Sequence, residues 1–168
     1  MRYFKIGIWI FIIFLIQTVI LARVHIFSAM PSLVLPYVVC VMLLEDDFKA
    51  AWIVSLICAA AAGALCGREF IVQVLYIFYT SLAVFALRKK PLYISGFLKG
   101  IGWTFILSAV MEIIFLVLRS HTLNGDMLLY AVLPTAVINA AFVFVIYPIL
   151  KRTMYKEEEK KLLIGDIV

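Results

Sequence analysis

Six long apolar runs dominate this sequence and limit what the chain can fold into. They cover residues 6–22, 26–44, 50–66, 70–87, 100–118 and 128–150, with short polar segments between them. A helix of about 20 apolar residues crosses the hydrocarbon of a bilayer. The composition, 66% hydrophobic and 15% charged, lies far from that of soluble globular domains. We therefore predict an all-α, polytopic membrane protein with six transmembrane helices in residues 1–150 and a cytoplasmic tail over 151–168.

The first two apolar runs each carry a feature that bears on whether they form membrane helices. The first exceeds the roughly 7 to 15 apolar residues of a signal peptide, and no convincing small-x-small cleavage site follows it, so we expect a membrane helix. The second run contains Pro31 and Pro36. We predict Pro31 in the first turn of that helix, and we expect Pro36 to bend it by removing a hydrogen bond.

The basic residues predict the orientation, because short cytoplasmic loops keep Lys and Arg. If six spans place both termini on one side, that side holds Arg2, Lys5, Lys49, Arg88, Lys89, Lys90, Lys99, Lys151, Arg152, Lys156, Lys160 and Lys161. The other side holds Arg23, Arg68 and Arg119. Both termini are therefore expected in the cytoplasm.

The loop cations Arg88, Lys89, Lys90 and Lys99 form what we call the basic patch. We expect the patch to rest near anionic lipid headgroups, and a docking surface for a cytoplasmic partner is the alternative. The net charge of +5 follows from this topology, so we do not predict nucleic-acid binding.

The sequence offers little for catalysis or metal binding. It contains no phosphate-binding G-x-x-x-x-G-K-[ST], no H-E-x-x-H and no G-x-S-x-G motif, and we expect no enzyme activity and no cofactor. Cys40, Cys58 and Cys66 are predicted to be small buried apolar residues. The acidic residues at 45–47 lack the loop spacing of a calcium site and are predicted to form a polar helix connection.

Glu112 is the one ionisable residue well inside a predicted span. A carboxylate there costs on the order of 3 kcal/mol on insertion scales, so it should face protein. We leave three roles open: a structural ion pair with Arg68 or Arg119, a contact with a partner or ligand, and a proton relay.

The stretch "AAAAGALCGREF" at 59–70 carries small residues at four-residue spacing. Cys58/Ala62/Cys66, Ala59/Gly63/Gly67 and Ala60/Ala64 all show this pattern, which lets membrane helices approach closely. The pattern predicts a helix contact but does not say whether the neighbour belongs to the same chain.

In the order of its features, the sequence resembles the bacterial rod shape-determining protein MreD family. The features are a proline-started helix with an acidic exit ("PSLVLPYVVCVMLLEDD"), a small-residue helix end ("GALCG"), a basic loop ("ALRKKP") and a closing helix ("VLPTAVINAAFVFVIYPILKR"). That last helix holds Pro134, Asn139, Tyr147 and Pro148. One departure is Gly67, which stands four residues after Gly63 where family members commonly carry an acidic residue; Glu69 lies two further on.

The resemblance implies a non-enzymatic adaptor of the cell-elongation machinery in the bacterial cytoplasmic membrane. It implies binding to MreC and coupling of MreB filaments to peptidoglycan synthesis by RodA and a class B penicillin-binding protein. We expect the third helix, before any other element, to form the interface, and we expect the buried polar groups Glu112, Asn139 and Gln73 to orient the partner through hydrogen bonds. The expected partner-binding residues are Ala59, Gly63, Gly67, Glu112, Pro134 and Asn139.

A second hypothesis is the substrate-binding subunit of an energy-coupling-factor vitamin transporter, whose six-helix fold the MreD family is thought to resemble. Such a binder needs convergent polar or aromatic groups near the outer face. Trp103, Glu112, Asn124, Tyr130 and Asn139 are the candidates. The first run lacks the Ala-x-x-x-Ala face typical of that class, which favours the adaptor. A small membrane protein of no assigned class is the third alternative.

Overall fold

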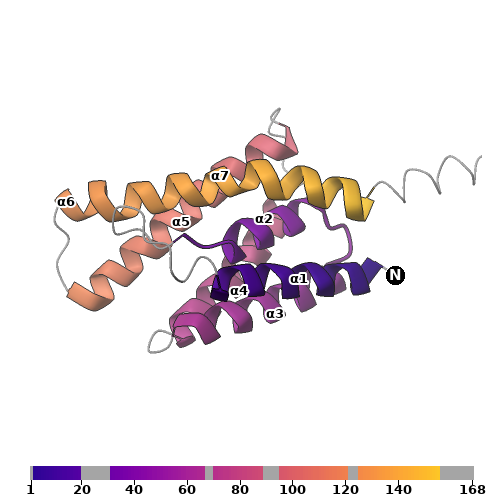
Figure 1. Ribbon diagram of the computed structural model, residues 1–168, viewed down its shortest axis with the longest axis horizontal. Helices are drawn as coiled ribbons and strands as arrows, with labels where there is room; N and C mark the ends of the chain where they lie inside the picture. The colour runs from indigo at the N-terminus through magenta and orange to yellow at the C-terminus, as the bar shows by residue number, and fades with distance from the viewer. Residues whose placement is uncertain (1, 20–30, 67–69, 89–94, 121–124, 156–168) are drawn as a thin grey trace, which may run out of the picture.

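The structure, a computed structural model, describes residues 2–19, 31–66, 70–88, 95–120 and 125–155, and these are helical almost throughout (Figure 1). The α-helices are α1 (Arg2–Val19), α2 (Val34–Leu44), α3 (Phe48–Cys66), α4 (Phe70–Leu87), α5 (Gly96–Ser120), α6 (Gly125–Met127) and α7 (Leu133–Leu150). Two π-helical stretches, η3 (Leu128–Val132) and η4 (Lys151–Tyr155), flank α7. The predicted all-α fold is confirmed for this part of the chain.

Three helical segments are long and apolar enough to cross a membrane: Phe70–Leu87, Gly96–Arg119 and Leu129–Thr153. Three further apolar helices, Phe4–Val19, Val34–Leu44 and Phe48–Ala64, are shorter. Large apolar side chains such as Phe4, Ile71 and Phe144 lie exposed on the surface. An apolar surface of this extent would be costly in water, so the structure is consistent with a membrane protein.

The short helix α2 lies at the centre of the bundle. It contacts α1, α3, α4, α5 and α7, and each of its residues from Val34 to Met42 is buried. The helix is apolar on all sides, which is the pattern expected of a helix enclosed by others. The hairpin of α3 and α4 packs on one side of α2, the pair α5 and α7 packs on another, and α1 contacts α2 and α3 (Figure 1).

The prediction of a helix over 26–44 is wrong at its start. Residues 31–33 are not helical, and α2 begins at Val34; the earlier residues 26–30 lie outside the described part of the chain. Pro31 therefore precedes the helix. Pro36 is the third residue of α2, within the first turn, where a backbone N–H has no partner inside the helix. Proline is tolerated there because no hydrogen bond inside the helix is lost, so the reason for the predicted bend does not apply.

The last predicted span forms a continuous helical run from Gly125 to Tyr155, longer than the predicted 128–150. Pro134 lies in the first turn of α7, directly after η3. A proline ring clashes with the carbonyl four residues earlier, here that of Tyr130. Tyr130 belongs to η3, and the wider π-helical turn gives its carbonyl room.

Gly63 brings α3 and α4 close together. A Cβ atom at Gly63 would collide with Val74 Cγ2, and it would lie 3.0 Å from Phe70 Cδ2 and 3.1 Å from the Phe70 carbonyl oxygen. The backbone oxygen cannot move without shifting α4. The close approach therefore depends on the missing side chain.

We predict that Gly63→Ala destabilises the protein relative to Gly102→Ala. Both changes gain helix propensity, roughly 0.5–1 kcal/mol, but a Cβ at Gly102 meets no atom within 4 Å. The difference between the two variants should therefore report the overpacking at Gly63, about 1–3 kcal/mol. Thermal unfolding in detergent measures it, and equal melting temperatures would contradict the close α3–α4 contact.

Candidate functional site

Two amide side chains hold the non-helical backbone that precedes α2. Gln17 on α1 donates through Nε2 to the Pro31 carbonyl (3.1 Å) and accepts through Oε1 from the Leu33 N–H (2.7 Å). Asn139 on α7 accepts through Oδ1 from the Ser32 N–H (2.8 Å). Non-helical backbone at membrane depth is tolerated where protein groups satisfy it. We call Gln17, Asn139 and residues 31–33 the polar junction.

Asn139 extends the polar junction to a third helix. Its Nδ2 donates to Ser108 Oγ on α5 at 3.1 Å, and both side chains are fully buried. A single amide thus connects α7, α5 and the segment before α2. The sequence predicts Asn139 as a partner-binding residue, and the structure places its amide in hydrogen bonds within the chain.

Further polar side chains join other helices. Ser81 on α4 donates to Ser55 Oγ on α3 at 2.8 Å, and Tyr76 on α4 donates to the Leu107 carbonyl of α5 at 2.6 Å. Two buried oxygens, Gln73 Oε1 and Thr104 Oγ1, have no hydrogen-bond partner among the described residues. The expectation that Gln73 helps to orient a partner stays a prediction.

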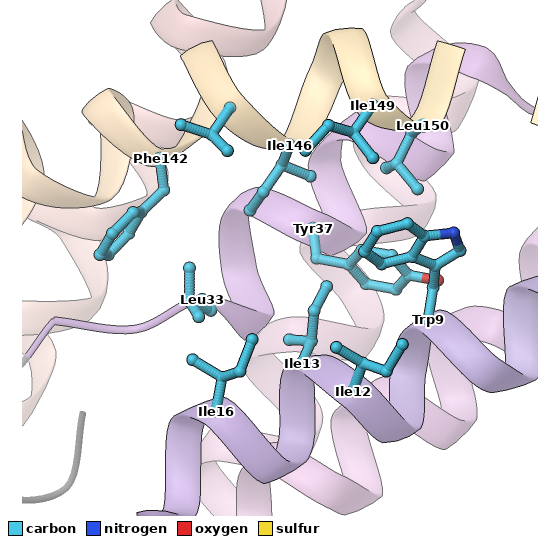
Figure 2. Close-up of a pocket in the computed structure, with 11 residues that line it drawn as sticks. Trp9, Ile12, Ile13, Ile16, Leu33, Tyr37, Phe142, Ile146, Ile149 and Leu150 are labelled. Atoms are coloured by element: carbon cyan, nitrogen blue, oxygen red, sulfur yellow. The ribbon is translucent and has the colours of Figure 1, made fainter. Parts of the chain in front are cut away.

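An apolar cavity of about 310 Å³ lies between α1, α2 and α7 (Figure 2). It is lined by apolar and aromatic side chains: Trp9, Ile12, Ile13, Ile16, Leu33, Tyr37, Phe142, Val145, Ile146, Ile149 and Leu150. Its floor is formed by Leu33, directly before α2, and by Tyr37 of α2. The residues predicted for a vitamin site do not line it: Trp103, Glu112, Tyr130 and Asn139 lie elsewhere, and Asn124 lies outside the described residues.

The small-residue face of α3 packs partly inside the chain. Ala59 and Gly63 are buried, and Gly63 lies against α4. Gly67 lies outside the described residues. The neighbour of this face is therefore the chain's own helix in the described structure. Ala60 and Ala64, on another side of α3, are exposed.

Glu112 on α5 and Pro134 in the first turn of α7 are both half-buried. Of the two cations considered for Glu112, Arg68 lies outside the described residues. Arg119 is exposed, with its guanidinium 5.8 Å from the centre of the Phe115 ring. The three roles left open for Glu112 stay open.

The basic patch is less uniform than the sequence indicates. The Arg88 side chain is only 7% exposed: its Nη2 lies 2.9 Å from Asp46 Oδ1, and its guanidinium lies 4.3 Å above the Phe85 ring. Lys99 is half-buried, while Lys89 and Lys90 lie outside the described residues. Arg88 therefore joins the α2–α3 connection to the end of α4.

The acidic connection between α2 and α3 is held by its own carboxylates. The buried Glu45 accepts through Oε1 from the N–H groups of Asp46 and Asp47, both at 3.0 Å. Asp47 Oδ1 accepts from the Lys49 N–H at 2.9 Å, in the first turn of α3. Carboxylates placed at a helix start in this way satisfy donors that have no partner inside the helix.

Sequence reasoning missed Gln17, Ser108 and the residues that line the cavity. Gln17 carried a usable signal, because an amide inside an apolar run is costly unless it is hydrogen-bonded. Its partner, the backbone at 31–33, could not be recognised while that segment was assigned to a helix. The cavity had no signal, because its lining residues look like any other apolar positions.

We predict that Asn139→Ala destabilises the protein more than Ser108→Ala does. The first change leaves the partly buried Ser32 N–H without its acceptor and the buried Ser108 without its bond to the amide, at a cost of about 1–3 kcal/mol. The second removes one hydroxyl, and interhelical hydrogen bonds in membranes average about 0.6 kcal/mol. Equilibrium unfolding in bicelles compares the two, and a larger loss for Ser108→Ala would contradict the assigned role of Asn139.

We also predict that Arg88→Ala destabilises the protein more than Asp46→Asn does. The ion pair has an exposed member and contributes at most about 1 kcal/mol. The Arg88 side chain additionally packs over Phe85, and that contact contributes roughly another 0.5–1 kcal/mol. Melting temperatures at low and high salt test this, because only the ion-pair part should respond to salt.

The described groups can therefore do two things chemically: they hydrogen-bond one another across helices, and they offer an apolar cavity to an apolar occupant.

No protein-family model, no curated protein and no solved structure matches this chain.

Proposed function

We propose that the chain is a non-enzymatic membrane adaptor of the MreD type. In this proposal it crosses the bacterial cytoplasmic membrane six times, keeps both termini in the cytoplasm, and binds MreC. It thereby helps to couple MreB filaments to peptidoglycan synthesis by RodA and a class B penicillin-binding protein. Its mechanism is association within the bilayer rather than chemistry on a substrate.

One observation carries the proposal: interior polar side chains hold the chain's own helices together. Gln17 and Asn139 hydrogen-bond the backbone before α2, and Ser55 pairs with Ser81. Groups used in this way fix the relative positions of the helices. The outward faces remain apolar along their length, as on α1 and α7. A rigid bundle with apolar faces suits docking of other membrane helices by shape.

The polar junction also supports six membrane passes. At 1.5 Å per residue, the 11 residues of α2 extend about 16 Å, which is well short of the roughly 30 Å hydrocarbon core. A second pass therefore needs non-helical chain before Val34. Such backbone is permitted in a membrane where protein encloses it, and at residues 31–33 Gln17 and Asn139 satisfy its polar groups.

The cavity does not favour the alternative function, a vitamin-binding transporter subunit. A vitamin site needs polar groups that converge on the ligand to fix its orientation. The cavity between α1, α2 and α7 has an apolar lining, and the amide of Asn139 is used within the polar junction. The adaptor is therefore the preferred proposal.

The test is purification of the tagged chain from its native membranes in mild detergent or nanodiscs, followed by mass spectrometry of proteins and small molecules. We expect MreC to co-purify, with RodA or a penicillin-binding protein. Recovery of a transporter ATPase module or a bound vitamin, without elongation proteins, would overturn the adaptor proposal.

A matched pair of variants locates the interface. Ala60 and Ala64 are exposed, four residues apart on α3, and so offer a close approach to a second helix. We predict that Ala60→Leu lowers co-purification of the partner several-fold while the melting temperature is kept. Ala141→Leu, at an exposed position of α7, is the control and should leave co-purification unchanged. If Ala141→Leu lowers co-purification and Ala60→Leu does not, the interface lies on α7 and not on α3.

A further inference from the structure

The apolar cavity has cations at one end. Leu150, which lines the cavity, is followed directly by Lys151 and Arg152 of η4, and both are exposed. The stretch η4 contacts α1, which starts at this same end of the molecule (Figure 1). Trp9 of α1 lies beside Leu150 and Ile149 in the cavity wall (Figure 2). The cavity thus ends close to the end of α7, which two exposed cations follow.

The volume of the cavity, about 310 Å³, indicates the size of its occupant. An apolar cavity of about 150 Å³ holds benzene, which has six carbon atoms. By that measure, about a dozen carbon atoms of an alkyl chain fit here.

The lining decides between an apolar and a polar occupant. The cavity wall exposes no polar surface, and the Tyr37 hydroxyl donates to the Ile6 carbonyl at 3.3 Å. A polar solute would lose its hydration without gaining partners there. An alkyl chain has no hydrogen bonds to lose when it enters the cavity, and its van der Waals contacts with the wall stabilise it there.

We propose that this cavity binds one acyl chain of an anionic phospholipid, with the lipid phosphate against Lys151 and Arg152. The chain lies over Leu33 and Tyr37, between α1 and α7, and the headgroup lies at the end of the cavity marked by Trp9. Basic residues at a membrane surface attract anionic lipids, so the two exposed cations that follow Leu150 should select such a lipid over a zwitterionic one. The inference does not depend on the adaptor function, because it needs no protein partner.

Fluorescence quenching tests the proposal directly. The variant Trp52→Phe/Trp103→Phe leaves Trp9 as the single tryptophan. This protein is placed in phosphatidylcholine vesicles with increasing amounts of phosphatidylglycerol brominated near the carboxyl end of its acyl chain. Brominated phosphatidylcholine in the same matrix is the reference. We expect saturable quenching of Trp9 by the anionic lipid, at a several-fold lower mole fraction than for the reference lipid.

Two sets of variants examine the two ends of the site. Lys151→Gln/Arg152→Gln should weaken the preference for the anionic lipid by about fivefold for each cation removed. Lys49→Gln, an exposed cation on α3, is its control. Ile146→Phe places an aromatic ring in the cavity and should weaken saturable quenching by both lipids, whereas Val137→Phe, exposed on the same helix and outside the cavity, should not.

Equal quenching by the two brominated lipids, or a preference unaffected by Lys151→Gln/Arg152→Gln, would overturn the proposal. These two substitutions lie at exposed positions, so the test does not depend on whether Ile146→Phe folds. Native mass spectrometry of the unmodified chain supplies a second measurement. We expect phosphatidylglycerol to be retained through delipidation, and loss of all lipid under conditions that preserve the fold would also contradict the site.

Discussion

The fold depends on the hydrogen bonds that Gln17 and Asn139 make to the backbone before α2. Three polar backbone groups of residues 31–33 lie partly buried among the helices, and a backbone group left unsatisfied there costs free energy. The two amides come from α1 and α7, which approach α2 at its start. Because α2 contacts all the other long helices, the position of that start affects the whole bundle.

The cavity follows from the same arrangement. Helices α1 and α7 both reach the polar junction, and α2 lies at the bottom of the gap between them, with Tyr37 facing the gap (Figure 2). The side chains of α1 and α7 leave this space unfilled. Protein interiors are usually close-packed, so an apolar void of about 310 Å³ lacks contacts that an apolar occupant can supply.

Much of the helical architecture could be predicted from the sequence, because apolar runs mark helices well in a chain of this composition. The bounds of α4 agree with the predicted 70–87, and α3 starts two residues before the predicted 50. The start of α2 could not be predicted. A uniformly apolar run has no periodicity to separate helix from extended chain, and Pro31 and Pro36 each fit a helix start.

The candidate site was less predictable than the fold. The small-residue pattern correctly indicated a close helix contact at Gly63, but spacing alone does not identify the neighbour, which proved to be α4. Asn139 was recognised as a buried polar group, but its acceptor role toward Ser32 depends on a segment 107 residues earlier. Contacts of that separation follow from topology, which a single sequence does not reveal.

The long-range bond from Ser32 to Asn139 also has a consequence for biogenesis. The chain is synthesised from its N-terminus, so the segment before α2 is made 107 residues before Asn139 of α7. Until α7 arrives, the Ser32 N–H lacks its acceptor, and α2 lacks the helix that encloses it on that side. The first helices therefore form an unfinished assembly while the chain is being made, and the last helix completes the core.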